Sequence, residues 1–487
     1  MNLSLFLTVG KGNCHSSGWF FAKGHILQSM QIKVVAIKNY KKGLVILLFL
    51  VSSNFLTGQT VRDPLPSKVT LSQCLSYALA NQAQVKQALL DEEIARKDIG
   101  IALSGWYPQL EIDGNLQHYL RLPATNYPNL GNPPQFTPWV TIPSTINNSS
   151  TGIFYASQAL FNSTLYFAAR NSGEYRIQAS QNTLSSKINT YVDVNKAFFD
   201  VLITEEQLHV LDEDIHRLER NYQDAFALYQ SGITDKIDYQ RTQIALSNIR
   251  AQRKSTEEAL KSKYAFLKQL MGVVPEEQLT VSYDSARFEN EILFDTTKNL
   301  DYNNRIEYQL FQTRMRLQHS QVGYYNWSFL PTLSAFYENS PSFQSGQFSD
   351  LYNKASRTTF LGLKFSLPLF QGMNRIENLK KAKLQYQRLQ FGMDYMKSVI
   401  NTEYTQALAL YTGNLNELKV ARENVTLATN IFNTVKLQYT KGVKAYLEVI
   451  VSETDLRSAE LNYLNLLFKV LTSKMDLERA LGMIKPE

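Results

Sequence analysis

Histidine and cysteine, the side chains that most often bind metals or attack substrates, are few in this sequence and do not cluster. Beyond residue 59, the histidines are His118, His209, His216 and His319. His209 and His216 lie two helical turns apart, but they belong to no set of histidines and carboxylates that could ligate a metal. Two cysteines, Cys14 and Cys74, are too few for a disulfide scaffold or a cysteine zinc site. We expect surface or packing roles for the histidines and no metal.

Catalytic motifs are absent as well. The sequence has no G-x-S-x-G nucleophile turn, no Walker loop and no acid–base pair that can be placed in one pocket. An enzyme is therefore not expected, and neither is a cofactor. The function has to be sought in the architecture.

The net charge of +7 suggests an anionic partner such as nucleic acid, but its position in the chain argues otherwise. Six of the seven excess charges come from lysines in residues 1–59, a stretch without Arg, Asp or Glu. The remainder is nearly neutral, so nucleic-acid binding is not expected. The lysines are followed by the short apolar run 44–51 and by small and polar residues, which is typical of a signal peptide.

This apolar run is too short to span a bilayer, which needs about 20 residues. We therefore expect residues 1–59 to be an N-terminal extension and signal peptide, with a membrane anchor as the alternative. Met30 stands where a signal peptide would start. No later segment is apolar for about 18 residues, which argues against a helical membrane protein. Cys74 is expected to be a small buried side chain.

The chain contains an internal duplication. Gly232 and Gly442 stand 210 residues apart in similar turns, and Gly272 and Gly482 keep the same offset. Two further matches lie upstream at similar offsets, namely Leu160-Phe161 with Leu369-Phe370 and Tyr107-Pro108 with Leu330-Pro331. We therefore expect a first repeat over 60–272, an inter-repeat equatorial segment over 273–302 and a second repeat over 303–487.

Each repeat predicts one very long helix. From Val194 to Tyr229, residues with unbroken 3-4 spacing are apolar except Thr204, as in a coiled coil, and the pattern recurs 210 residues later with Asn414 as its polar member. From Phe161 to Gly232 there are 71 residues without proline, enough for a helix of about 105 Å. The flanking segments 71–106 and 236–271 also have helical patterns and together match its length.

Between the helices the period changes to two. Alternating polar and apolar residues predict strands over about 108–119, 151–161, 331–339 and 358–369. A half-apolar strand of about 10 residues can cross a bilayer when tilted. The connections 120–150 and 340–357 are rich in Pro, Asn, Ser and Gly and are expected to be loops. Any one strand alone could also belong to a soluble sandwich.

Four strands cannot close a barrel, and lipid does not tolerate open sheet edges. Closure therefore requires several chains. Two chains would form a filled barrel of about eight strands, whereas three would leave an open lumen. Helices that all leave the same side of this barrel would extend it as a tunnel. The architecture predicts a conduit.

At this point the residues resemble a known family. The Tyr-x-x-Gly-(Ile/Val) turns at Gly232 and Gly442, the Leu-Phe before each long helix and the Leu-Gly that ends the second repeat resemble TolC-type outer-membrane efflux proteins. The resemblance implies a homotrimer whose mainly α fold combines a 12-stranded β-barrel, four strands per chain, with a long α-helical barrel.

The resemblance also implies a function. The chain would be the exit duct of an efflux or type I secretion system in the outer membrane of a Gram-negative bacterium, with its helical barrel in the periplasm. It would lie in outer-membrane lipid and work with a periplasmic adaptor and an inner-membrane transporter. A periplasmic adaptor or a structural coiled-coil protein remains the alternative. The cargo, whether drug, metal, siderophore or polypeptide, is not indicated.

The family's periplasmic gate maps onto residues 439–448. Tyr439 and Lys444 match its aromatic and basic residues, and Glu448 matches the first of two acidic positions. Val451 stands at the second, so a double acidic ring is not expected. In the first repeat, Asp238 matches the acid that pairs with the tyrosine or its basic neighbour. Without the family, these residues would be interpreted as solvated turn residues.

The resemblance places adaptor docking at the helix turns, at Gly232, Ile233, Gly442 and Val443. The glycines also have a purely structural interpretation, since a tight turn between helices often needs positive φ. Both interpretations can hold together.

Overall fold

The computed structural model describes residues 68–128, 139–283 and 292–486. The expected leader, residues 1–59, lies outside the described residues together with Cys14 and Met30. Among the described residues, no helix is both long enough and apolar enough to cross a membrane.

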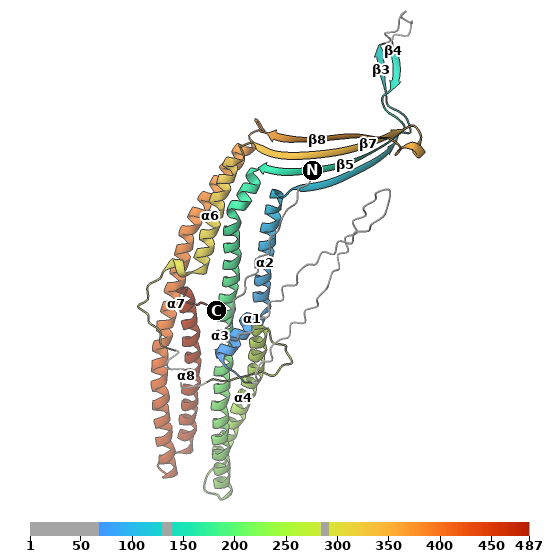
Figure 1. The fold of residues 1–487 in the computed structure, drawn as a ribbon. Coiled ribbons are helices and arrows are strands. Elements are labelled where there is room, and N and C mark those ends of the chain that lie inside the picture. The colour runs from blue at the N-terminus through green and yellow to red at the C-terminus, as the bar shows by residue number, and fades with distance from the viewer. Residues whose placement is uncertain (1–67, 129–138, 284–291, 487) are drawn as a thin grey trace, which may run out of the picture. The chain divides into compact units, whose positions relative to one another are not determined.

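Two very long helices dominate the fold (Figure 1). They are α3 (Ser163–Gln230), with 68 residues, and α7 (Asn374–Thr440), with 67 residues. Shorter helices lie along each of them: α2 (Ala83–Leu103) and α4 (Lys236–Met271) along α3, and α6 (Ile306–Trp327) and α8 (Tyr446–Ala480) along α7. Helix α3 also contacts α6 and α8, which joins the two repeats.

The first long helix begins where a side chain caps it. Asn162 accepts hydrogen bonds from the backbone N–H groups of Thr164 and Leu165, as a good N-cap does. The second begins four residues after the expected Phe370. Gly372 and Met373 take left-handed φ values of 58° and 67°, and this tight turn delays the helix to Asn374.

The helix expected over 71–106 is broken. It forms α1 (Leu71–Asn81), α2 and a short 3-10 turn (Ser104–Trp106), with Gln82 in an extended conformation between α1 and α2. Gly272, at the end of α4, packs against this break, since a Cβ atom there would lie 2.8 Å from the Asn81 carbonyl oxygen. Gly482 packs in the same way against Asn304, where its Cβ would lie 2.5 Å from the carbonyl oxygen. The glycine that ends each repeat thus permits a close backbone crossing.

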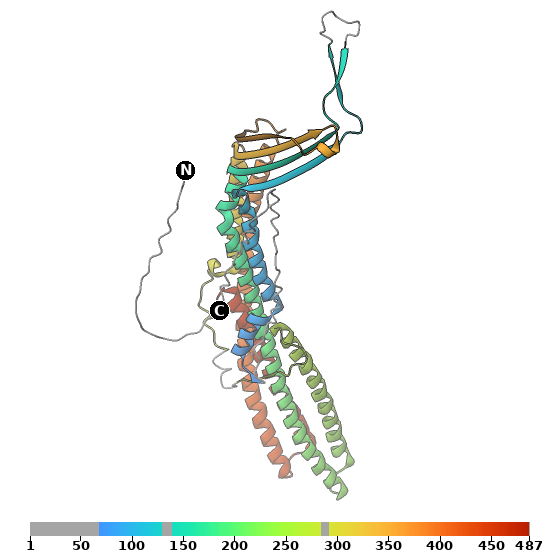
Figure 2. The ribbon, with the colours of Figure 1, turned by 45° about the vertical axis from the view of Figure 1, so that its right-hand side comes forward.

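The strands form one antiparallel sheet in the order β2-β5-β7-β8. Their bounds are β2 (Gln109–His118), β5 (Asn148–Phe161), β7 (Thr332–Ser345) and β8 (Ala355–Ser366). Within the described chain, β2 and β8 each pair with a strand on one side only. The sheet begins where the upper helices end (Figure 2). One chain therefore offers two open edges.

Two expected loops contain strands. β7 continues to Ser345, where residues from 340 onward were expected to be loop, because it keeps pairing with β5 and β8. Within 120–150, β3 (Ala124–Pro128) and β4 (Trp139–Pro143) form a separate hairpin. Polar and proline-rich composition did not exclude strands there, because pairing between neighbouring segments satisfied the backbone.

The two faces of the sheet differ in chemistry. Strand alternation places apolar residues on one face, which we call the apolar face: Leu110, Ile112, Leu116, Leu361, Leu363 and Phe365. These side chains are exposed in the single chain. The opposite face, which we call the polar face, carries Glu111, Asp113, Asn115 and Lys364. Such a sheet separates an apolar from an aqueous environment.

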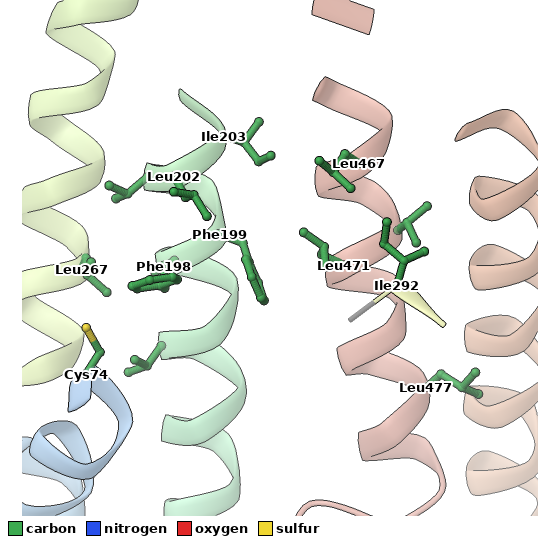
Figure 3. Packing of buried hydrophobic residues seen from close by; sticks show 14 of the residues in the cluster. Cys74, Phe198, Phe199, Leu202, Ile203, Leu267, Ile292, Leu467, Leu471 and Leu477 are labelled. Carbon is green, nitrogen blue, oxygen red and sulfur yellow. The ribbon is translucent and has the colours of Figure 1, made fainter. Parts of the chain in front are cut away.

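The main hydrophobic core surrounds the middle of α3 and includes side chains of α4 and α8 (Figure 3). Phe198 and Leu267 pack there with Cys74, whose burial confirms its expected role. Burial raises the pKa of the Cys74 thiol to about 12, so it stays protonated. The inter-repeat segment contributes Ile292, whose carbonyl accepts a 2.7 Å hydrogen bond from the Tyr411 hydroxyl. A short parallel pair, β1 (Lys68–Val69) with β6 (Thr280–Val281), lies beside this core.

The predicted 3-4 seam is largely buried. On α3 it includes Val194, Val201, Leu211 and Leu218, all buried. The polar residue in this seam, Thr204, donates a 2.7 Å hydrogen bond to the Asp200 carbonyl and accepts one of 2.7 Å from the Lys263 ammonium. Because its hydroxyl is hydrogen-bonded, burying Thr204 in the seam destabilises the helix packing little.

Candidate functional site

The two helix turns at the tips have the same geometry. Gly232 and Gly442 both have φ of 74°. Their N–H groups donate to the carbonyls of Tyr229 at 3.0 Å and Tyr439 at 2.9 Å, and the next residue in each turn bonds one carbonyl further back. This is the helix C-cap that a left-handed glycine provides. The structural interpretation of both glycines is therefore confirmed.

The space around these glycines is open. A Cβ atom on either would meet no atom within 4 Å. The residues that follow, Ile233 and Val443, are each 70% exposed. An apolar side chain thus protrudes at the same place on both tips, without a partner within the described chain. Such exposed apolar residues at a tip are suited to contact another protein.

Tyr439 lies within a small apolar cluster that joins the two hairpins. Its ring centroid is 5.3 Å from that of Tyr446 on α8, and Ala225 on α3 belongs to the same cluster. Burial raises the pKa of the Tyr439 hydroxyl, and the negative charge of Asp238 adds to the effect. The hydroxyl is therefore protonated at neutral pH and available as a donor.

Tyr446 makes a direct polar link between the hairpins, and sequence reasoning missed it. Its buried hydroxyl lies 3.0 Å from that of Thr242 on α4, which is also 2.9 Å from the Asp238 carbonyl oxygen. Burial raises the pKa of Tyr446 to about 12. The sequence could have indicated this role, because Tyr446 follows Tyr439 by seven residues and both rings therefore lie at one helix–turn–helix junction.

Asp238 occupies the first turn of α4, where a carboxylate favours the positive helix end. Within the described part of the chain, no hydrogen bond or ion pair joins its carboxylate to Tyr439 or Lys444. Its negative charge nonetheless contributes to the raised pKa of Tyr439. The structure of one chain therefore brings this acid near the tyrosine without a direct bond.

Lys444 pairs within its own hairpin. Its ammonium lies 2.5 Å from the Glu448 carboxylate, one helical turn away, and both side chains are exposed. An exposed pair of this kind contributes about 0.5 kcal/mol, so it can be exchanged easily for another partner. Val451 is half exposed on the same helix and carries no charge.

A buried charge network, which we call the α3–α8 network, lies further along the same helices, and sequence reasoning missed it. Asp214 on α3 and Glu453 on α8 are 0% and 1% exposed. Arg217 pairs with both acids, and its Nε lies 3.4 Å from Glu453 Oε1. Arg457 Nη1 lies 3.4 Å from Asp214 Oδ2. The network thus ties one repeat to the other.

The bonding in the α3–α8 network is incomplete. Neither Arg217 Nε nor Glu453 Oε1 makes an aligned hydrogen bond, although they lie at ion-pair distance. Burial raises the pKa of Glu453 against the opposing effect of Arg217 and Arg457. The sequence did contain a sign of this network: the two repeats differ here, since the residues 210 positions after Asp214 and Arg217 are the uncharged Asn424 and Leu427.

The histidines lie apart from these features. His209, His216 and His319 are exposed, as expected, and His118 Nδ1 lies 2.6 Å from the Asn148 side-chain oxygen. Across the described ranges, no group of three or more His, Cys, Asp or Glu side chains could hold a metal ion. The chemistry at the helix tips is therefore limited to weak contacts, such as the Lys444–Glu448 pair, that can be broken and formed again.

The chain is similar to known proteins over most of its length. The family model described as outer membrane efflux protein matches residues 74–273 and 309–483. The proteases secretion protein PrtF of Dickeya chrysanthemi is 19% identical over 422 residues, covering 84% of this chain and 87% of PrtF.

Solved structures have the same fold. CusC superposes with a TM-score of 0.68 at 18% identity, covering 85% of this chain and 92% of CusC. The Neisseria gonorrhoeae MtrE outer membrane channel, in its open state, superposes with a TM-score of 0.66 at 17% identity, covering 85% of this chain and 88% of MtrE.

Proposed function

The chain belongs to the outer membrane efflux protein family, and from this premise we propose that it is a passive exit duct closed at its periplasmic end by its own helix tips. The predicted fold is confirmed: a trimer with a β-barrel of four strands per chain, continued by an α-helical barrel. The channel lies in the outer membrane, with the helical barrel in the periplasm. It is a transport protein, and we propose no enzymatic activity.

One observation carries the duct function. A four-stranded sheet with two open edges and one apolar face continues directly into helices of 68 and 67 residues. Open edges in lipid must be paired, so the edges of neighbouring chains close the barrel. The polar face then lines the lumen, and the helices extend it away from the membrane by about 100 Å.

The organisation of the chain along its sequence remains a proposal. We assign residues 60–272 and 303–487 to two repeats and 273–302 to the equatorial segment between them. The family match, which is interrupted between 273 and 309, supports this division. Residues 1–59 are proposed to be the N-terminal extension and signal peptide.

The partners are proposed to be a periplasmic adaptor and an inner-membrane transporter. The matching tips support this, since Ile233 and Val443 protrude equally beside Gly232 and Gly442. An adaptor with two similar binding elements could engage both tips. PrtF is a proteases secretion protein, which makes polypeptide one candidate cargo for the present chain.

The gate is proposed to consist of Tyr439, Asp238, Lys444 and Glu448. The support is physical: Tyr439 is a protonated donor near the acid Asp238, and Lys444 is held by an exposed pair with Glu448. Such contacts are weak enough for an adaptor to disrupt by differential binding of a few kcal/mol. Tyr446 and Thr242 are added to the gate as its buried hydrogen bond.

Fractionation and electrical recording test the duct. Native chain should be recovered from the outer membrane as heat-labile trimers, and purified trimers should carry discrete current steps in planar bilayers. Recovery as a periplasmic monomer without channel current would contradict the proposal and favour an adaptor or a structural coiled coil.

A further inference from the structure

The polar face of the sheet carries aromatic rings at positions where a water-filled lumen would be expected to have polar side chains. Tyr155 on β5, Phe336 on β7 and Phe360 on β8 share this face with Glu111. The ring centroids of Tyr155 and Phe336 are 6.2 Å apart, and those of Phe336 and Phe360 are 5.9 Å apart. One continuous aromatic patch thus crosses three strands.

Acids alternate with these rings in a single row across the sheet. Glu111 pairs in register with Tyr155, Tyr155 with Glu338, and Glu338 with Phe360. Asp113 lies one position further along the same face. Across the described part of the chain, no ion pair involves these three acids. Lys364, on the same face of β8, does not neutralise this row.

The presence of Phe336 on the polar face can be explained by packing alone. A Cβ atom at Gly362 would lie 2.7 Å from the Phe336 ring, so Phe336 covers a glycine in the neighbouring strand. Covering a glycine with an aromatic cross-strand neighbour stabilises a sheet. That reason does not extend to Tyr155 or Phe360, which lie beside Glu338.

We propose that this row, Glu111, Tyr155, Glu338 and Phe360 with Phe336, is a binding site for planar organic cations in the lumen of the barrel. A flat cationic ring can stack on the aromatic faces, which attract positive charge, while the carboxylates supply the opposite charge. Repetition in three subunits makes a ring of such sites, and rings of charged side chains select ions in pores. The inference rests on the proposed duct, because it needs the polar face to line the lumen.

Ethidium binding tests the site. Trimers in phosphatidylcholine nanodiscs should increase ethidium fluorescence saturably, after subtraction of empty nanodiscs. Benzyltrimethylammonium should compete, whereas tetramethylammonium, which lacks a ring, and the anionic dye pyranine should not. Glu338→Gln and Phe360→Leu should each weaken binding by about fivefold.

The opposite face of the same strand offers a matched control. Phe365 is 63% exposed on the apolar face of β8, so Phe365→Leu should leave ethidium binding unchanged. Absence of saturable binding, or an equal loss in Phe365→Leu, would overturn the site. If a lumen variant fails to form trimers, Glu111→Gln replaces it. Current recordings on the same trimers separate the two proposals, since current without ethidium binding refutes only the site.

Discussion

At the scale of single residues, the important side chains are those that hold the two hairpins together. The Tyr446–Thr242 hydrogen bond and the α3–α8 network both cross from one repeat to the other. The two differ in the free-energy cost of burying their polar groups. A buried pair of hydroxyls is neutral, whereas ionised Glu453 must be compensated by Arg217 and Arg457.

Stability should depend on pH through Glu453. Burial raises its pKa above the ordinary value of 4.5, so the folded chain binds the proton more tightly than the unfolded chain. This stabilisation is present at acid pH and is lost as pH rises through the raised pKa. In Glu453→Gln that loss should vanish, so the melting temperature of the variant should rise relative to that of wild type as the pH increases above 4.5.

The charged groups that face Glu453 provide a second variant for this measurement. Arg217 faces it from α3, Arg457 from α8 and Lys436 from α7, while Asn221 Nδ2 donates a 3.2 Å hydrogen bond to it. Arg217→Leu leaves the acid less compensated and should destabilise the trimer by about 3 kcal/mol at neutral pH. Parallel pH profiles for wild type and Glu453→Gln would contradict the assignment.

Gate contacts should limit current. Tyr439→Phe with Asp238→Ala, or Tyr446→Phe with Thr242→Val, should raise single-channel conductance about twofold or more, because each removes polar contacts that hold the tips closed. The measurement is a planar-bilayer recording. Tyr229→Phe is the control, since Tyr229 is the repeat counterpart of Tyr439 and the substitution keeps its ring, which lies 5.0 Å from that of Tyr239, while its hydroxyl makes no hydrogen bond within the described residues. Unchanged conductance in both double variants would count against the gate.

At the scale of elements, glycine decides how the helices end. Gly232, Gly272, Gly442 and Gly482 all have positive φ, so each terminates a helix in the left-handed conformation. The two at the tips face open space, and the two at the repeat ends lie against backbone. The same residue type therefore has two roles.

These roles predict different costs for alanine. Gly232→Ala should cost about 1 kcal/mol, since only the backbone conformation is strained. Gly272→Ala should cost about 3 kcal/mol, since its Cβ would also lie 2.8 Å from the Asn81 carbonyl oxygen. Thermal melting of the two variants, followed by circular dichroism, compares them directly. Equal melting temperatures would refute the close crossing.

The tips should bind the adaptor through their apolar side chains. Ile233→Asp with Val443→Asp should abolish crosslinking to the adaptor in cells while trimers still form, because charged groups are costly to bury at an interface. Crosslinked partners are identified by mass spectrometry. Leu120→Asp is the control and should crosslink normally, since Leu120 is an exposed apolar residue two positions beyond the end of β2. A double variant that crosslinks like wild type would exclude docking at the tips.

At the scale of the whole molecule, helices and strands leave matching unpaired surfaces. Helix contacts run α2 to α3 to α6 to α7, so α2 and α7 lie at the two ends of the row. Each exposes an apolar stripe away from its own neighbour, Leu90, Ile94 and Ile101 on α2 and Leu384, Phe391 and Tyr395 on α7. In a closed trimer, the stripe of one subunit can cover that of the next.

Charge in this stripe should prevent assembly. Phe391 is 77% exposed in one chain, so Phe391→Asp should leave the subunit folded but reduce the yield of trimers strongly, since burying an unpaired carboxylate is costly. Unheated gel electrophoresis of outer membranes measures the trimer. Gln390→Asp introduces the same charge one position away, on another side of the helix, and should assemble normally. Full assembly of Phe391→Asp would place the interface elsewhere.

The sequence by itself determined the long helices and the four strands, which follow from local periodicity, and the repeats, which follow from motifs at a constant offset. The need for several chains then follows, because four strands cannot close a barrel in lipid. The sequence also located Gly232 and Gly442, whose turns depend on their own backbone conformation. Only the tertiary structure revealed the break at Gln82, the hairpin of β3 and β4, the Tyr446–Thr242 bond and the α3–α8 network. Those features depend on contacts between residues far apart in the chain, such as Asp214 and Arg457, and a local pattern holds no information about which distant residue will lie opposite.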